Sequence, residues 1–262
     1  MSSILPLTSS SCRCVSFNIR VGIETSLAQI ATDLESLKPD LIALQEVGDS
    51  WIMGPPLKQT AYLSSALGLP YFHFAPSLTA RSGQHFGISL ISRWPLLNIQ
   101  HHFLPQDQDE QRSFVSASIH PPFADQSWGI ITTHLSINEP ERIQQSQTIV
   151  KHIHQNFSSP HTPLLVLGDL NDRPSTPTMT PFTDFLTDGY EYIQNQKGRD
   201  HDHHVKENSG DQNSLGFTFS VKDPHRRIDY LLSRSLQIHH VDVATHLQSS
   251  DHFPLLGIFG SL

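Results

Sequence analysis

The chain has 262 residues, 37% of them hydrophobic, and its 25 acidic and 17 basic residues give a formal net charge of −8 at pH 7. An acidic protein repels the phosphate backbone, so this charge does not favour tight, salt-dependent binding to long duplex DNA. The two cysteines, Cys12 and Cys14, are too close on one predicted strand for a relaxed disulfide and too few for a zinc ribbon. The composition therefore excludes a disulfide framework.

Neither a secretory signal nor a membrane span is expected from the sequence. Residues 1–11 contain no basic residue, and no run approaches the roughly 18 apolar residues of a membrane-spanning helix. We therefore expect a flexible segment over residues 1–11, a single domain over residues 12–262, a monomer and a cytoplasmic location.

Strand and helix patterns are mixed in the first part of the chain. Leu27, Ile30 and Leu34 recur with helical spacing, and Pro39 follows the end of that segment. Residues 40–46 form a mostly apolar run that predicts a buried strand with a carboxylate at its end. In this part we expect strands over 14–20, 40–46, 87–93 and 113–120, and helices over 27–37 and 60–67.

Strand and helix patterns are also mixed in the second part of the chain. Pro140 occupies the first-turn position that favours proline, just before a helical apolar stripe. Here we expect strands over 128–134, 163–167, 228–233 and 255–259, and helices over 141–157 and 180–187.

Residues 194–215 are polar and contain Gly198 and Gly210, which predicts a long loop. Because such loops in compact domains are usually functional or disordered, we expect a flap that gates the substrate. The histidine-rich run His201–His204 fits a solvated loop better than a transition-metal site.

The expected fold class is α/β (α+β). Strands and helices do not alternate strictly, as they would in a parallel wound sheet. This favours two mostly antiparallel sheets packed face to face, with the helices outside.

Several polar residues stand where predicted strands end, and most of them offer carboxylate or amide oxygens. Such oxygens suit Mg²⁺ or Mn²⁺ better than zinc. Two imidazoles could donate hydrogen bonds to a phosphoryl oxygen, an aspartate beside one of them would keep it protonated, and another aspartate could deprotonate a water. The oxygen-bearing candidates are Asn18, Glu46, Asp169, Asn171, Asp229 and Asp251, and the imidazoles are His134 and His252.

Seven short motifs, spread in order over nearly the whole chain, resemble those of the endonuclease/exonuclease/phosphatase superfamily. This superfamily includes deoxyribonuclease I, exonuclease III, inositol polyphosphate 5-phosphatases and neutral sphingomyelinases, and the resemblance implies a four-layered α/β sandwich. The motifs are Ser16–Arg20, Ala43–Glu46, Gly87–Arg93, Thr132–His134, Leu167–Asn171, Arg227–Tyr230 and Ser250–His252.

The same resemblance implies a division of roles at a metal site. Glu46 would be the principal ligand of Mg²⁺ or Mn²⁺, with Asn18 beside the metal and Asp251 at or next to it. Asp169 would handle the nucleophilic water. These assignments make the chain a metal-dependent hydrolase of phosphoesters.

The remaining candidates would contact or orient the phosphate. By the resemblance, Asn171 contacts the phosphate, Asp229 orients His252, and His252 binds the scissile phosphate. His134 matches the branch of the superfamily that has histidine after the central strand.

Three further residues are open to two interpretations. Arg20 and Arg112 could bind phosphate through planar, bidentate contacts, or could form surface salt bridges. His85 stands just before the predicted 87–93 strand, where some members of the superfamily place a residue that supports the first histidine.

The residues around 216–229 resemble the small, mostly uncharacterised metal-dependent hydrolases of the superfamily. We therefore expect a phosphodiesterase or phosphatase that acts on a small or lipid-derived phosphoester. Two alternatives stay open. One is a nuclease for single strands or short ends, and the other is a catalytically silent relative that binds a partner.

Overall fold

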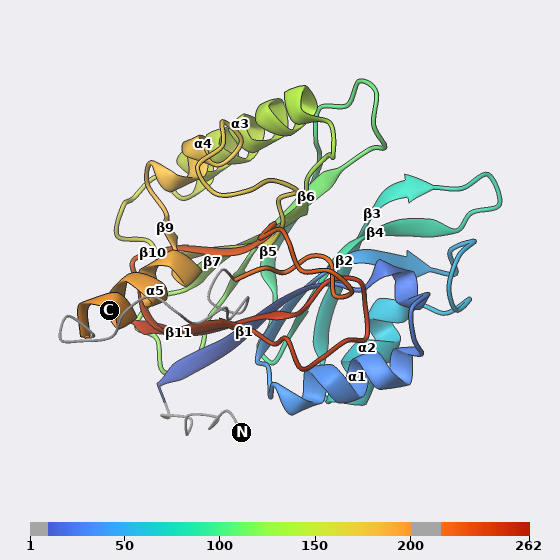
Figure 1. Cartoon of the computed structure of the whole chain (residues 1–262), viewed down its shortest axis with the longest axis horizontal. Helices are drawn as coiled ribbons and strands as arrows, with labels where there is room; N and C mark the ends of the chain where they lie inside the picture. The colour runs from blue at the N-terminus through green and yellow to red at the C-terminus, as the bar shows by residue number, and fades with distance from the viewer. Residues whose placement is uncertain (1–9, 201–215) are drawn as a thin grey trace.

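A computed structural model describes residues 10–200 and 216–262. It contains two six-stranded sheets, which pack face to face (Figure 1). The first sheet has the strand order β11-β12-β1-β2-β4-β3 and the second has the order β5-β6-β7-β8-β10-β9. Among the strands of the described residues, only the pairs β1–β2 and β7–β8 are parallel. The prediction of two mostly antiparallel sheets is therefore confirmed.

The first sheet joins the two ends of the chain, because β1 pairs with β12. The second sheet comes from the middle of the chain. The strands of the first sheet are β11 (Leu236–Val243), β12 (Leu255–Ser261), β1 (Ser11–Asn18), β2 (Leu41–Asp49), β4 (His85–Ser92) and β3 (Tyr71–Thr79). Those of the second are β5 (Leu97–Phe103), β6 (Ser113–Ile119), β7 (Trp128–His134), β8 (Leu164–Asp169), β10 (Asp229–Arg234) and β9 (Thr187–Asp188).

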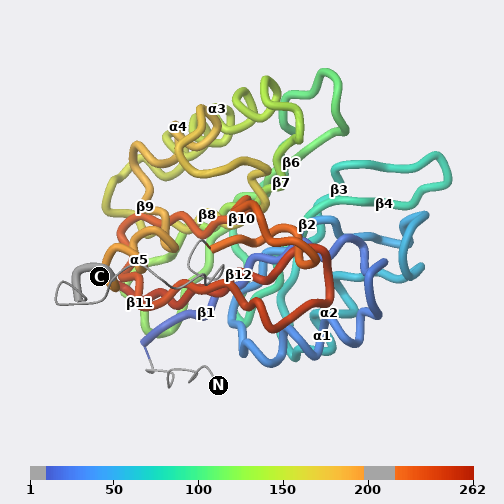
Figure 2. Tube along the Cα trace, in the orientation of Figure 1, coloured from blue at the N-terminus to red at the C-terminus, as the bar shows by residue number. Residues whose placement is uncertain are grey.

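Helices cover the outer face of each sheet and complete a four-layered sandwich (Figures 1 and 2). The helices α1 and α2 lie outside the first sheet, and α3 and α4 lie outside the second. Helix α5 contacts β10 and β11, one strand from each sheet. The helices are α1 (Leu27–Ser36), α2 (Gln59–Leu67), α3 (Glu139–Asn156), α4 (Thr180–Thr183) and α5 (Gly189–Asp200), with a 3₁₀ turn η1 (Arg20–Gly22) after β1.

Alternation along the central strands produces three apolar layers. In β1, Cys12 and Cys14 face the second sheet, whereas Val15 and Phe17 pack on the α1 side. A third cluster joins the second sheet to α3 and α4. The buried strands therefore carry apolar residues on both faces, which leaves the strand ends as the place for polar groups.

The structure corrects several predicted boundaries. Ser11 already belongs to β1, and residues 19–20 leave that strand because Arg20 and Val21 adopt positive φ in η1. The helix predicted over 180–187 ends at Thr183, and β9 follows it. Residues 1–9, the rest of the segment predicted to be flexible, lie outside the described residues.

The loop prediction for 194–215 is wrong over its first residues. Helix α5 runs from Gly189 to Asp200, and the Asp188 carboxylate accepts hydrogen bonds from the backbone N–H groups of Tyr190 (3.0 Å) and Glu191 (3.3 Å) at the start of the helix. This cap stabilises the start of the helix. The helix was not predicted because its residues are mostly polar. Residues 201–215, with the run His201–His204 and most of the predicted flap, lie outside the described residues.

Candidate active site

Four of the predicted site residues stand at strand ends that meet at one edge of the two packed sheets. Asn18 ends β1, and His134 and Asp169 end the parallel neighbours β7 and β8. Asp229 begins β10 and is the register partner of Asp169, which is in turn the register partner of His134. The strand pairing alone therefore places these three side chains side by side.

Asp169 is the centre of this group. One carboxylate oxygen accepts a hydrogen bond from Asn18 Nδ2 (3.1 Å) and lies 3.5 Å from His134 Nε2 and 3.7 Å from His252 Nε2. The other oxygen accepts a bond from the Asn171 backbone N–H (2.9 Å). Burial, followed by the neighbouring charge of Asp229, raises the pKa of Asp169 to about 7. This carboxylate can therefore exchange a proton near neutral pH.

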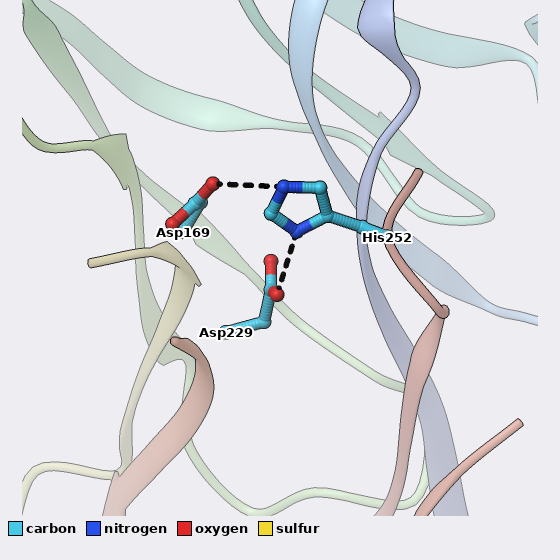
Figure 3. A group of neighbouring side chains, drawn as sticks. All are labelled: Asp169, Asp229 and His252. Atoms are coloured by element: carbon cyan, nitrogen blue, oxygen red, sulfur yellow. Dashed lines mark hydrogen bonds and ion pairs between the residues drawn. The ribbon is translucent and has the colours of Figure 1, made fainter. Parts of the chain in front are cut away.

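His252 is held as a cation by two aspartates (Figure 3). Its Nδ1 donates to Asp229 Oδ2 at 2.9 Å, while its Nε2 faces Asp169. Burial alone would lower the pKa of His252, but the charges of Asp229 and Asp169 outweigh it and raise the pKa to about 9. At pH 7 the ring is thus an imidazolium.

His134 also lies beside Asp169, but burial and a neighbouring cation favour its neutral form. Arg112 Nη1 donates to its Nδ1 at 2.9 Å, and Asn171 Nδ2 lies 3.0 Å from its Nε2. Burial and the Arg112 charge hold the pKa of His134 well below its usual range. Two imidazoles, one charged and one neutral, therefore flank a single carboxylate.

Asn18 joins Glu46 to this group. Its Nδ2 donates to Glu46 Oε1 (3.1 Å) as well as to Asp169, and its Oδ1 accepts from the Arg20 backbone N–H (3.1 Å). Asn18 thus presents its amide N–H groups to two carboxylates, and its oxygen is already engaged. Glu46 lies in the β2 bulge between Leu44 and Val47 with a φ of 52°, and Asn171 also has a φ of 52°.

Left-handed backbone at residues other than glycine is energetically unfavourable and gathers at functional sites. Glu46 lies in the bulge of β2, and its Oε1 accepts the hydrogen bond from Asn18 Nδ2.

The two candidate arginines lie at different depths, and both form ion pairs. Arg20 Nη1 lies 3.4 Å from Asp251 Oδ2 and also contacts Glu24, so it reaches the edge of the site as an ion-pair partner. Arg112 is buried against His134, and its Nη2 pairs with Glu110 (2.9 Å). Each arginine therefore has an acidic partner.

His85 is not brought to His134 by any contact among the described residues. Its Nδ1 lies 2.9 Å from Thr79 Oγ1, and it pairs in register with Asp49, three residues beyond Glu46 on β2. A supporting role for His85 has no contact in its favour.

Gly168 permits the close approach that places Asp169 beside His134. A Cβ at this position, where φ is 157°, would lie 2.1 Å from the Thr133 carbonyl oxygen on the neighbouring strand. We expect Gly168→Ala to lower the free energy of unfolding by about 2 kcal/mol or more, because backbone must shift to relieve the clash. Urea unfolding measures this loss.

A matched control for this variant is Gly83→Ala. A Cβ at Gly83 meets no atom within 4 Å, although its φ of +85° is also unfavourable for other residues. This control isolates the cost of positive φ from that of the clash. Equal losses of stability in the two variants would contradict the role assigned to close strand packing.

Phe219 is a site neighbour that the sequence did not single out. It forms bridges to both Arg226 and His252, and its ring centroid lies 4.8 Å from that of His252. The preceding Thr218 accepts bonds at Oγ1 from the backbone N–H groups of Ile228 and Asp229, each at 3.2 Å. The aromatic residues of the 216–221 segment were the available signal, but pattern alone does not place them against a histidine.

The Endonuclease/Exonuclease/phosphatase family model matches residues 15–252. The chain belongs to this family. It is accordingly a hydrolase of phosphoesters, and its DNase I-like fold is the one that the motifs predicted. A search of curated protein sequences finds no match.

Solved structures agree with the fold of this family member. An endonuclease/exonuclease/phosphatase family protein of Bacteroides thetaiotaomicron has a TM-score of 0.73 at 15% identity, with 97% of this chain and 96% of that chain covered. The human Nocturnin catalytic domain has a TM-score of 0.72 at 19% identity, covering 98% and 96%. The mannosyl-6-phosphatase of B. thetaiotaomicron has a TM-score of 0.70 at 16% identity, covering 95% and 99%.

Among the described residues, no helix combines the length and the apolar character that crossing a membrane requires.

Proposed function

We propose that this protein is a Mg²⁺-dependent phosphodiesterase or phosphatase that acts on a small or lipid-derived phosphoester. The observation that carries the proposal is the position of Asp169 between a protonated His252 and a neutral His134, with Glu46 tied to it through Asn18. A proton acceptor and a fixed positive charge at one strand edge suit attack of water on phosphorus.

The donor set fits a hard cation. Glu46 and Asp251 are partly exposed carboxylates, and the buried Oδ1 of Asp229 has no hydrogen-bond partner, so negative charge at this edge is incompletely balanced. Oxygen ligands of this kind suit Mg²⁺ or Mn²⁺. We assign Glu46 as the principal ligand, Asp251 as its neighbour, and Asn18 as the residue that holds Glu46 in place.

A second group, Asp169, Asp229 and His252, has ligand atoms within 4.8 Å of one another. It suits a metal less well, because His252 Nδ1 already bonds to Asp229 and the raised pKa keeps its ring protonated. A protonated imidazole offers no lone pair to a cation. These three residues are better suited to proton transfer and charge stabilisation.

The residues would then divide the reaction as follows. Mg²⁺, when bound, neutralises charge on the phosphoryl oxygens and polarises water. Asp169, with a pKa near 7, accepts a proton from the attacking water. The His252 imidazolium, held by Asp229, would bind the scissile phosphoryl group, and we assign Asn171 and His134 as further contacts to its oxygens.

The small-substrate proposal rests on charge. The chain has a net charge of −8, and the site arginines Arg20 and Arg112 are each paired with acids. A long polyanion requires many unpaired cations along its path. A nuclease for short or single-stranded ends stays as the alternative. The expected monomer stays a prediction.

The test is a substrate panel in Mg²⁺ with bis-p-nitrophenyl phosphate, p-nitrophenyl phosphate and a single-stranded oligonucleotide at low and high salt. The proposal expects release of p-nitrophenol from at least one small ester with weak salt dependence. Cleavage of the oligonucleotide alone, with a steep salt dependence, would favour the nuclease. A protein that neither turns over any of them nor binds Mg²⁺ would be a silent relative.

A further inference from the structure

Arg226 differs from the paired arginines around the site. Its guanidinium carbon lies over the Phe219 ring, 4.6 Å from the centroid, and its Nε is buried without a hydrogen-bond partner. Within the part of the chain that the structure describes, no carboxylate pairs with this guanidinium. Arg20, Arg112 and the adjacent Arg227 all contact acids instead.

Phe219 links this cation to the proposed phosphate-binding histidine. It forms antiparallel bridges with Arg226 on one side and His252 on the other. Both are isolated bridges outside the named strands. Phe219 N–H donates to Arg226 O (3.0 Å) and Arg226 N–H donates to Phe219 O (2.9 Å), and each of these oxygens also accepts a second backbone N–H, from Thr218 (2.9 Å) or His225 (3.0 Å). The side chains of Arg226 and His252 both contact the Phe219 ring, the first at 4.6 Å from the guanidinium carbon to the ring centroid and the second at 4.8 Å between ring centroids, so the three form one row.

The two ends of this row differ in how they are paired. His252 bonds to Asp229 Oδ2 at 2.9 Å and faces Asp169, whereas the Arg226 guanidinium, which keeps its charge at any pH of interest, has no carboxylate partner among the described residues. Arginine held on an aromatic ring, with a free fork of N–H donors, is suited to a phosphate or carboxylate group.

We infer that Arg226 forms a second anion-binding position, so that the preferred substrate carries another phosphate or a carboxylate besides its scissile phosphoryl group. This inference rests on the proposed function for the placement of the scissile group at His252. The Phe219 ring, which already carries Arg226 and contacts His252, is poorly placed to stack on a nucleobase. The row therefore favours a second charge over a base as the feature recognised.

The experiment compares two probes, propyl phosphate and 1,3-propanediol bisphosphate, by isothermal titration calorimetry in EDTA, so that neither probe is hydrolysed during the titration. The wild type is expected to bind the bisphosphate at least about tenfold more tightly, as a charge-assisted contact predicts. Arg226→Gln should bring the ratio of the two Kd values close to one, and Arg226→Lys should restore part of the preference. Lys151→Gln, which removes an exposed charge on α3, should keep the full preference.

Three results would overturn the inference: no preference in the wild type, an unchanged preference in Arg226→Gln, or an equal loss in Lys151→Gln. The test is separable from the proposed function. A protein with no turnover but an Arg226-dependent preference for the bisphosphate would refute the hydrolase mechanism alone. Mg²⁺-dependent turnover without that preference would refute the second anion position alone.

Discussion

Asp169→Asn is expected to reduce kcat by about 10²- to 10⁴-fold, with a much smaller change in KM. Asparagine keeps the shape of the side chain and can still contact Asn18 and His252, but it cannot accept a proton from water. The rate of p-nitrophenol release under saturating Mg²⁺ measures the effect. A kcat within a few-fold of the wild type would remove Asp169 from the proposed role as proton acceptor.

The same variant should remain folded. Asp169 is buried beside Asp229, and replacing one of two neighbouring carboxylates removes repulsion and a desolvated charge. Its thermal midpoint should therefore equal or exceed that of the wild type, as happens where an active site trades stability for function. Asp184→Asn, an exposed substitution outside the site, serves as the control and should change neither kcat nor the midpoint.

Asp229→Asn is expected to lower kcat by about 10²-fold or more at pH 8 through its effect on His252. Among the carboxylate charges that raise the pKa of His252 to about 9, that of Asp229 has the largest effect. Without that charge His252 loses its proton at lower pH, so the basic limb of the kcat/KM profile should move to lower pH. Activity should then be retained best on the acidic side of the profile.

Two measurements check this prediction. The pH dependence of kcat/KM between pH 6 and 10 locates the basic limb, and an NMR titration of the metal-free protein follows the His252 ring itself. Asp242→Asn, an exposed change on β11, should leave both curves in place. A basic limb that is the same in Asp229→Asn and in the wild type would show that Asp229 does not set the charge of His252.

The sequence predicts the inner strands well and misses the edges. The strands β3, β5, β9 and β11 were not predicted, and they are the outermost strands of the two sheets. Inner strands are buried on both faces and appear as apolar runs, whereas the edge strands β3, β5 and β11 have many exposed or half-buried positions. In β3 a proline at Pro76 further obscures the pattern.

The site was predictable in its composition but not in its contacts. Strand-end positions and the ordered motifs suggested Asp169, Asp229 and His252, which the structure brings into contact. Their functional roles stay predictions. The buried pairing of Arg112 with His134 and the position of Phe219 arise from long-range packing, which short motifs do not encode.

The most direct test is Mg²⁺-dependent hydrolysis of bis-p-nitrophenyl phosphate by the wild type, by the wild type in EDTA and by His252→Ala. We predict turnover in Mg²⁺ that disappears in EDTA, returns when Mg²⁺ is restored, and falls by about 10²-fold or more in His252→Ala. Turnover that survives both EDTA and the loss of His252 would contradict a metal-dependent site built around Asp169 and His252.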